Sequence, residues 1–241
     1  TPDSEFNGSV QIEYKATDGT NLSNTANIHI YVNEVNANDD GDGILFSTSK
    51  ADGWENLDGN GFFTVKAFKK GEVLNADGSL NTAGELITED SEHLDNQYGM
   101  GVADSARGDG AGDVPYQVEY DHETDQSEAL RIDLTNPIKA LEFGVARLFA
   151  EENGTEVGQY TLYDADGNFI KVQEFSLDSG NSGKFTIISD VAFAYVVFEA
   201  LPRTKDGDNQ TSGDASDFVI TEITILSDKF IVEEGSTPDN S

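Results

Sequence analysis

Short runs in which apolar and polar residues alternate recur along the chain and predict β-strands. Each run is rich in β-branched and aromatic residues and is bounded by Gly, Asp or Asn, which favour turns. The best helix candidate, Thr82–Leu94, is short and not clearly amphipathic. We therefore expect an all-β protein, with strands within 6–14, 27–35, 44–49, 62–68, 98–102, 116–120, 129–134, 140–149, 159–165, 169–175, 183–189, 193–201 and 218–226.

The spacing of these runs divides the chain into three parts. The first two runs form one hairpin, and two strands cannot bury a core on their own. Residues 1–42 are therefore expected to belong to a sandwich that is completed elsewhere. In residues 43–228 the number and spacing of the runs favour a β-sandwich of jelly-roll type. Residues 229–241 are predicted to be a linker or the start of another module.

The charge of the chain is extreme, with a formal net charge of −32 at pH 7. Such a charge repels phosphate backbones and anionic lipid surfaces, so nucleic acid and membrane are poor candidate partners. It also destabilises a compact state unless bound cations neutralise part of it. Adaptation to high salt would give the same acidity without ion sites. Disorder is disfavoured because 37% of the residues are hydrophobic and 10% are aromatic.

Several kinds of site are disfavoured by composition. The chain has no cysteine, which excludes disulfides, a thiol nucleophile and thiolate metal ligands. Its three histidines, His29, His93 and His122, are far apart in unrelated patterns. A zinc site or a histidine-based catalytic triad is therefore not expected.

A glycine- and aspartate-rich stretch, Asn96–Val118, lies between two predicted strands and is the main candidate site. We call it the first acidic segment. It places the carboxylates of Asp104, Asp109 and Asp113 within ten residues. Calcium prefers six to eight oxygen ligands, which carboxylates and loop carbonyls can supply. The segment therefore predicts a calcium-binding loop, with a solvated loop without an ion as the alternative. Positive-φ turns are expected at its glycines, Gly99, Gly101, Gly108, Gly110 and Gly112.

The same chemistry recurs in Lys205–Phe218, which we call the second acidic segment. It supplies the carboxylates of Asp206, Asp208, Asp214 and Asp217 just before the last predicted strand. A third cluster, of Asp39, Asp40 and Asp42, stands at the boundary between the first two parts of the chain. All these aspartates are predicted metal ligands.

Three further motifs carry weaker signals. Asp164–Asn168, DADGN, begins like an EF-hand loop, but Phe175 stands where that loop needs a glutamate, so we interpret it as a hairpin turn. The segment Asp52–Gly61 contains Asp and Asn residues that could bind calcium, although Trp54 favours a packed anchor. The Arg107-Gly108-Asp109 tripeptide is too short to indicate integrin binding by itself.

Residues 8–40, GSVQIEYKATDGTNLSNTANIHIYVNEVNANDD, resemble the C-terminal part of the cadherin-like or immunoglobulin-like extender repeats of large bacterial surface adhesins. Such repeats close with a tyrosine-containing strand, a T-D-G turn, a strand rich in T, A and V, and a calcium-binding N-D junction. The resemblance implies that residues 1–42 are one half of a split extender domain. It also implies that Asp39, Asp40 and Asp42 hold calcium at the junction.

The second part resembles the ligand-binding, in particular peptide-binding, jelly-roll domains of calcium-dependent RTX adhesins. The likeness rests on YGMGV with DSARGDGAGD, on EALRIDL, on QYTLYDADGN and on SGDASDFVITEI. In that family a calcium ion at the mouth of the sandwich coordinates the C-terminal carboxylate of a bound peptide. The resemblance gives this role to Asp104, Asp109 and Asp113, with help from the second acidic segment. Tyr98 and Arg107 are further candidate ligand-binding residues.

The expected function is therefore calcium-dependent binding of peptide or protein C-termini by an extracellular, surface-located adhesin. Two alternatives remain open. A similar ion can hold vicinal sugar hydroxyls, as in a calcium-dependent lectin. A jelly-roll glycosidase would need two carboxylates at a defined separation, for which Glu119, Glu128 and Glu142 are the candidates. The abundance of glycine-rich aspartate loops favours a binding module over an enzyme.

Overall fold

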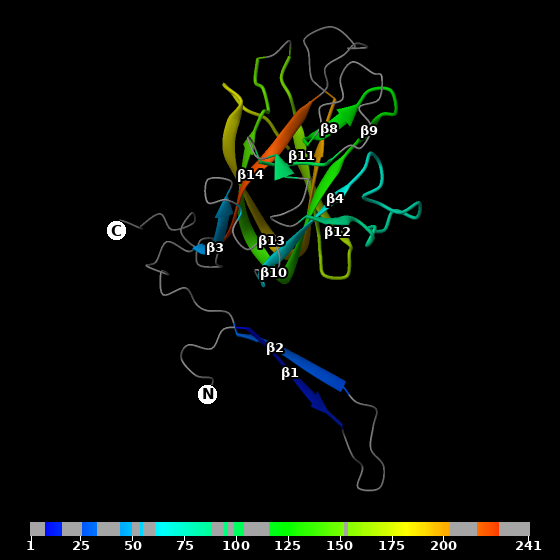
Figure 1. The fold of residues 1–241 in the computed structure, drawn as a ribbon, viewed down its shortest axis with the longest axis vertical. Helices are drawn as coiled ribbons and strands as arrows, with labels where there is room; N and C mark the ends of the chain where they lie inside the picture. Colours follow the sequence, from blue (N-terminus) through cyan, green and yellow to red (C-terminus); the bar gives the residue numbers. More distant parts are fainter. Residues whose placement is uncertain are drawn as a thin grey trace, which may run out of the picture.

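The structure is a computed structural model that describes residues 8–15, 26–32, 44–49, 54, 61–87, 94–95, 99–103, 116–151, 154–202 and 216–226. In these residues there are strands and turns but no helix, which confirms the all-β prediction (Figure 1). The strands are β1 (Gly8–Tyr14), β2 (Ala26–Val32), β3 (Ile44–Ser49), β4 (Phe63–Phe68), β5 (Glu85–Ile87), β6 (Leu94–Asp95), β7 (Gly99–Met100), β8 (Val118–Asp121), β9 (Gln126–Ser127), β10 (Ala129–Ala146), β11 (Gly158–Tyr163), β12 (Phe169–Phe175), β13 (Ser182–Ala200) and β14 (Asp217–Leu226).

Two very long strands, β10 and β13, run through the whole sandwich. They have 18 and 19 residues and pair antiparallel from Ala129 with Glu199 to Ala146 with Ser182. The pairing is irregular between Asp133 and Ala140, around Pro137. Proline lacks a backbone N–H, so it fits an irregular point where the ladder is interrupted. The sequence pattern predicts two separate strands, one on each side of such a break, whereas the structure joins them into one long strand.

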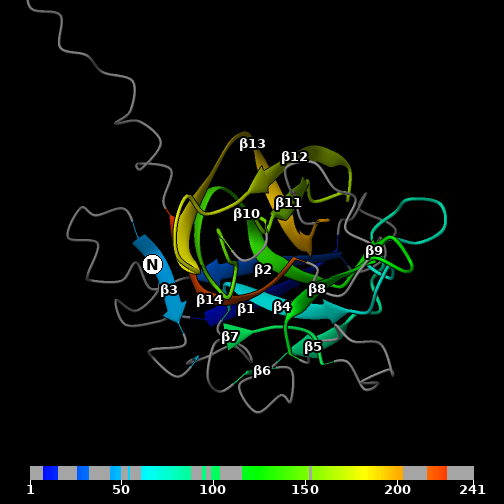
Figure 2. The same ribbon diagram turned by 90° about the horizontal axis from the view of Figure 1, so that it is seen from above.

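The break divides each long strand between two layers of one curled antiparallel sheet (Figures 1 and 2). In the first layer, the N-terminal half of β10 pairs with β4, and the C-terminal half of β13 pairs with β11. In the second layer, the C-terminal half of β10 pairs with β14, which also pairs with β3. This arrangement agrees with the predicted β-sandwich of jelly-roll type.

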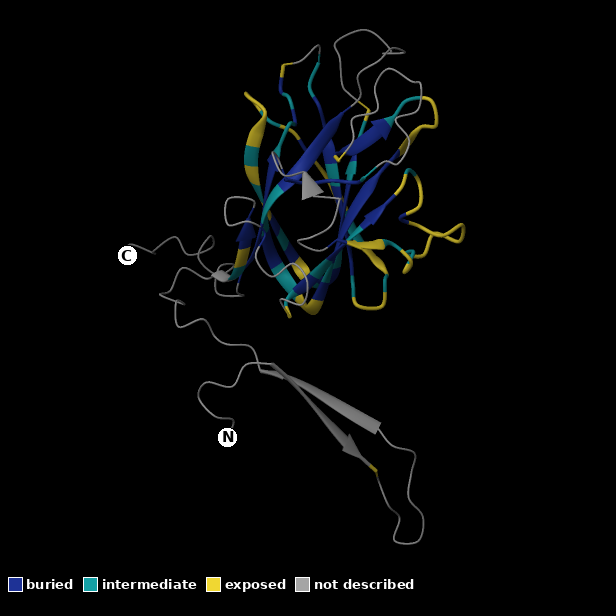
Figure 3. Ribbon diagram, viewed as in Figure 1, coloured by how far each residue is buried: buried dark blue, intermediate teal, exposed yellow. Residues whose placement is uncertain are grey.

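The core lies between the two layers, where the buried residues of Figure 3 gather. Phe143 is fully buried at its centre and contacts aromatic rings from both layers, with centroid distances of 4.8 Å to Phe198 and 5.2 Å to Phe175. Phe198 and Phe175 belong to the first layer and Phe143 to the second. These contacts therefore hold the layers together through apolar burial and edge-on aromatic packing.

The N-terminal hairpin is formed as predicted. Its strands β1 and β2 pair with each other from Gly8 with Val32 to Tyr14 with Ala26. Among the described strands they pair with no other. The division of the chain at residues 42 and 228, and the identity of this hairpin as part of an extender domain, stay predictions.

Two local predictions have clear outcomes. The weak helix candidate Thr82–Leu94 is wrong, because its described part contains β5, which pairs with β4 from Glu85 with Ala67 to Ile87 with Val65. The hairpin-turn interpretation of Asp164–Asn168 is confirmed. The turn joins β11 to β12, and Gly167 has a φ of 80° that favours glycine.

The first testable prediction concerns the core. Phe143→Ala removes a fully buried ring, so we expect it to lower the free energy of unfolding by about 3–5 kcal/mol. Phe169→Ala is the matched control, because that ring is 61% exposed and should change the free energy by less than about 0.5 kcal/mol. Urea unfolding followed by tryptophan fluorescence measures both. Equal losses for the two variants would contradict the two-layer core.

Candidate functional site

Most of the predicted site residues lie outside the described part of the chain, so the structure does not test their roles. Asp217 is described, at the start of β14, where its exposed fraction is 8%. The residues outside the described part are Asp39, Asp40, Asp42, Tyr98, Asp104, Arg107, Asp109, Asp113, Asp206, Asp208 and Asp214, together with the candidates Asp52, Asn56, Asp58 and Asn60.

The described residues on either side of 104–115 are held together by backbone hydrogen bonds. Val102 N donates to Gln117 O at 3.0 Å, and Tyr116 N donates to Val102 O at 3.1 Å. The same two residues, Val102 and Gln117, form an isolated antiparallel bridge. The two ends that flank residues 104–115 therefore lie side by side.

The flanks of 203–215 meet at the same place. Ser216 joins them, because its carbonyl accepts from Tyr120 N at 3.1 Å and its hydroxyl accepts from Val157 N at 3.0 Å. Val157 O in turn accepts from Leu201 N at 2.9 Å. The start of β14 then pairs with β8, Asp217 with Glu119. The described residues that flank 104–115 and 203–215 therefore lie together at one end of the sandwich, beside β8, which we call the acidic end (Figure 1).

The glycines at this end have two different roles. Gly99 has a φ of 150°, as expected for a positive-φ position, and a Cβ there would lie 2.3 Å from Ile220 O. Gly101 was expected to take a positive φ as well, and this is wrong. It is required for close packing, since a Cβ would lie 2.0 Å from Tyr116 O. Tyr116 itself, one of four described non-glycine residues with positive φ, has a φ of 67°, a conformation that costs about 1 kcal/mol or more.

The acidic end has a polar interior. Its buried polar residues are Gln117, Glu119, Glu128, Glu156, Ser216 and Asp217. Glu156 caps a neighbouring backbone group, because its Oε2 accepts from Phe149 N at 2.7 Å. Gln117 is fully buried, and within the described part of the chain neither polar atom of its side-chain amide has a hydrogen-bond partner.

An unpaired buried amide costs about 1–3 kcal/mol, so Gln117 needs an explanation. Its Oε1 is a neutral, hard oxygen, the type of donor that calcium accepts beside carboxylates. An amide oxygen at this position would suit a calcium site that also contained carboxylates. The alternating pattern does not reveal Gln117, because the polar positions 117 and 119 of the run YQVEY are expected to face solvent.

The candidate carboxylates for glycoside hydrolysis do not form one group. Glu119 and Glu128 are neighbours on the β8–β9 hairpin, where Glu128 N donates to Glu119 O at 2.9 Å. Glu142 lies elsewhere, on the outer face of the second layer, with its Oε1 3.6 Å from Lys184 Nζ. Hydrogen bonding to Glu222 and attraction to both glutamates raise the pKa of Lys184, so this group is an ordinary surface ion-pair cluster.

Within the described residues, no group of three or more His, Asp or Glu side chains is arranged to hold a metal by itself, and no helix could cross a membrane. Comparison of the chain with known protein families, with curated proteins and with solved structures finds no match. The interpretation of the acidic end therefore depends on its own geometry and chemistry.

One carboxylate near this end has a perturbed pKa. Glu199 of β13 lies opposite Ala129 and accepts a hydrogen bond from Gln159 Nε2 at 3.0 Å. Its burial raises the pKa above the ordinary value, although the hydrogen bond from Gln159 opposes this shift. Because the folded state favours the protonated form, Glu199 lowers stability as the pH rises above the ordinary glutamate pKa.

The second testable prediction follows from the raised pKa of Glu199. Glu199→Gln should raise the free energy of unfolding at pH 7, and the gain should shrink as the pH falls below the ordinary glutamate pKa, where the wild-type carboxyl becomes mostly protonated in both states. Glu174→Gln is the control, because Glu174 is an exposed glutamate on β12, which is separated from β13 by β11. Urea unfolding of the three proteins at several pH values measures the effect. A gain that does not depend on pH would contradict it.

Proposed function

We propose that this chain is a calcium-dependent adhesion module that binds the C-terminal carboxylate of peptides or proteins at the acidic end. The observation that carries the proposal is the common origin of the two acidic segments. Residues 102 and 117 join across the first segment, Ser216 closes the second, and Tyr120 N binds Ser216 O between them. The two segments, which carry seven aspartates, are thus flanked by described residues that lie together.

Electrostatics supports a cation at this point. The seven carboxylates of the two segments repel each other, and the net charge of −32 adds to the repulsion. The unpaired Gln117 amide and the buried Asp217 lie where the two segments meet the sandwich. We propose that Gln117 and Asp217 form the inner side of the ion site, with Asp104, Asp109, Asp113, Asp206, Asp208 and Asp214 as the ligands from the two segments.

The proposed ligand set gives separate roles to the ion, to the sandwich, and to Tyr98 and Arg107. A bound calcium ion would supply a positive centre with exchangeable positions that an anionic oxygen of a ligand can occupy. The sandwich holds the segment ends in fixed positions through the bonds of Val102, Tyr116 and Ser216. Tyr98 and Arg107 are proposed to contact the peptide beside its carboxylate. Such a module would act outside the cell, on the surface that carries it.

The third testable prediction concerns calcium and stability. Calcium at about 100 times its Kd should stabilise the wild type by about 2.7 kcal/mol, and a chelator should remove this gain. Gln117→Met should reduce the gain, because it removes one oxygen ligand. In chelator the same variant should be at least as stable as the wild type, since the unpaired buried amide is gone. Gln126→Met is the control at an exposed position.

Thermal unfolding of the three proteins with calcium or chelator gives the answer. An unchanged Tm of the wild type in excess chelator would contradict calcium binding. If calcium raises the Tm of the wild type and of Gln117→Met by the same amount, Gln117 is not a ligand of the ion. The ion would then be bound by residues of the acidic segments without Gln117.

The fourth testable prediction concerns the ligand. Peptides with a free C-terminus should bind the immobilised protein in calcium, and amidated versions should not, because amidation removes the carboxylate charge. Asp109→Ala should weaken binding at least tenfold while the Tm in chelator stays within about 2 °C of the wild type. Equal binding of free and amidated peptides, or competition by sugars alone, would replace peptide recognition with a calcium-dependent lectin function.

A further inference from the structure

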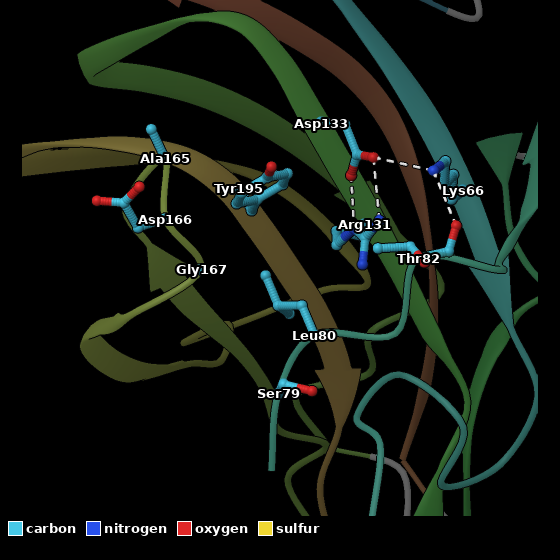
Figure 4. A pocket seen from close by; sticks show the side chains of 10 residues that line it. All are labelled: Lys66, Ser79, Leu80, Thr82, Arg131, Asp133, Ala165, Asp166, Gly167 and Tyr195. Carbon is cyan, nitrogen blue, oxygen red and sulfur yellow. Dashed lines mark hydrogen bonds and ion pairs between the residues drawn. The ribbon is translucent and has the colours of Figure 1, made fainter. Parts of the chain in front are cut away.

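A pocket of about 320 Å³ opens on the outer face of the first layer (Figure 4). Its floor is formed by Lys66 of β4, Arg131 and Asp133 of β10, and Tyr195 of β13. Residues 79–82 and the turn between β11 and β12 form its walls. A volume of this size suits a small ligand of one or two rings.

The floor of the pocket is rigid. Arg131 is 2% exposed, its Nη2 donates to Asp133 Oδ2 at 3.0 Å, and its Nη1 donates to Asn81 O at 2.6 Å. Its guanidinium lies 5.0 Å from the ring centre of Phe68 and 5.4 Å from that of Tyr195. A planar guanidinium with paired donors and two aromatic neighbours is held in one orientation. It therefore fixes the positions of Asp133 and Tyr195.

Hydrogen-bonding capacity remains on the side chains around this floor. Lys66 Nζ lies 3.3 Å from Asp133 Oδ2 and 3.3 Å from Thr82 O, so one of its three protons remains for a ligand. The Tyr195 hydroxyl makes no hydrogen bond to any residue in the described part of the chain, and it borders the pocket. The side chain of Asp133, 18% exposed, can accept a further bond.

The charged side chains around the pocket balance each other, which favours an uncharged ligand. The positive charges of Lys66 and Arg131 are balanced by the negative charges of Asp133 and Asp166. A pocket without net charge on a chain with a net charge of −32 does not attract anions. Closely spaced donors and acceptors beside an aromatic ring match a sugar ring, because its hydroxyls both donate and accept and its C–H groups pack on apolar surface.

We propose that this pocket binds a neutral saccharide unit without calcium, as a second binding site separate from the acidic end. The register of β10 and β13 supports the separation. Asp133 pairs with Tyr195 at the pocket, whereas Ala129 pairs with Glu199 near the acidic end. The two positions are four residues apart along β10, about 13 Å at the rise of a strand, and the pocket opens on the outer face of the layer.

Saturation-transfer NMR on the full chain tests the proposal with a fixed panel of glucose, galactose, mannose, fucose, N-acetylglucosamine, lactose and cellobiose. At least one of these sugars should bind in excess chelator. Tyr195→Phe removes only the hydroxyl and should weaken binding roughly fivefold, and Lys66→Met should weaken it tenfold or more. Lys184→Met, on the outer face of the second layer, is the control and should bind like the wild type.

Three results would overturn the proposal. If none of the sugars binds the wild type at millimolar concentrations, the pocket only anchors residues 79–82 to the sheet. If binding requires calcium, the sugar sits at the acidic end and not in this pocket. If Tyr195→Phe, which leaves every hydrogen bond of the described residues intact, binds like Lys184→Met, the sugar sits elsewhere. Loss of calcium binding at the acidic end would not affect any of these outcomes.

Discussion

The antiparallel pairing of β10 with β13 is the constraint on which the rest of this structure depends. Each strand crosses from one layer to the other at an irregular point near Pro137 and its partner residues, so the two layers share a common spine. Strand β4 pairs with the first half of β10, and β14 pairs with the second half. Strands that pair with β10 or β13, directly or through a neighbouring strand, carry most of the described residues of the acidic end and of the pocket. The connections between these strands carry the remaining ones.

A large negative charge acts against this compact arrangement. Several cations in the described residues form local ion pairs. Lys66 and Arg131 contact Asp133, and Lys184 contacts Glu142 and Glu222. The exposed pairs of Lys184 contribute little to stability and are weakened by salt. They do not offset the clustered aspartates of the two acidic segments, which is the physical reason why a bound divalent cation would matter more to this chain than to an ordinary domain.

The sequence predicts much of the fold, because half-buried strands leave a clear alternation of apolar and polar residues. The runs around Val65, Ile132, Leu162 and Phe198 all form strands, and the turn at Asp164–Asn168 is in place. The continuity of β10 and β13 is not visible, because Pro137 and Asp190 look like strand boundaries when only local pattern is considered.

The sites are less visible in the sequence than the fold. Aspartate-rich segments stand out by composition, but the adjacency of their ends depends on the long-range pairing of β14 with β8. Gln117 looks like an ordinary polar strand residue, and its burial without a partner appears only in three dimensions. The pocket combines Lys66, Arg131 and Tyr195 from strands that are distant in sequence, so no local motif marks it.

Hydrogen–deuterium exchange with and without calcium tests the central claim, that the two acidic segments form one ion site. Peptides that cover 96–120 and 202–218 should both exchange more slowly in calcium, with the same dependence on its concentration, while peptides from the centre of β10 and β13 change little. Protection of both segments in Asp217→Asn should require more calcium. Slower exchange in only one segment, or no change in either, would contradict a shared site.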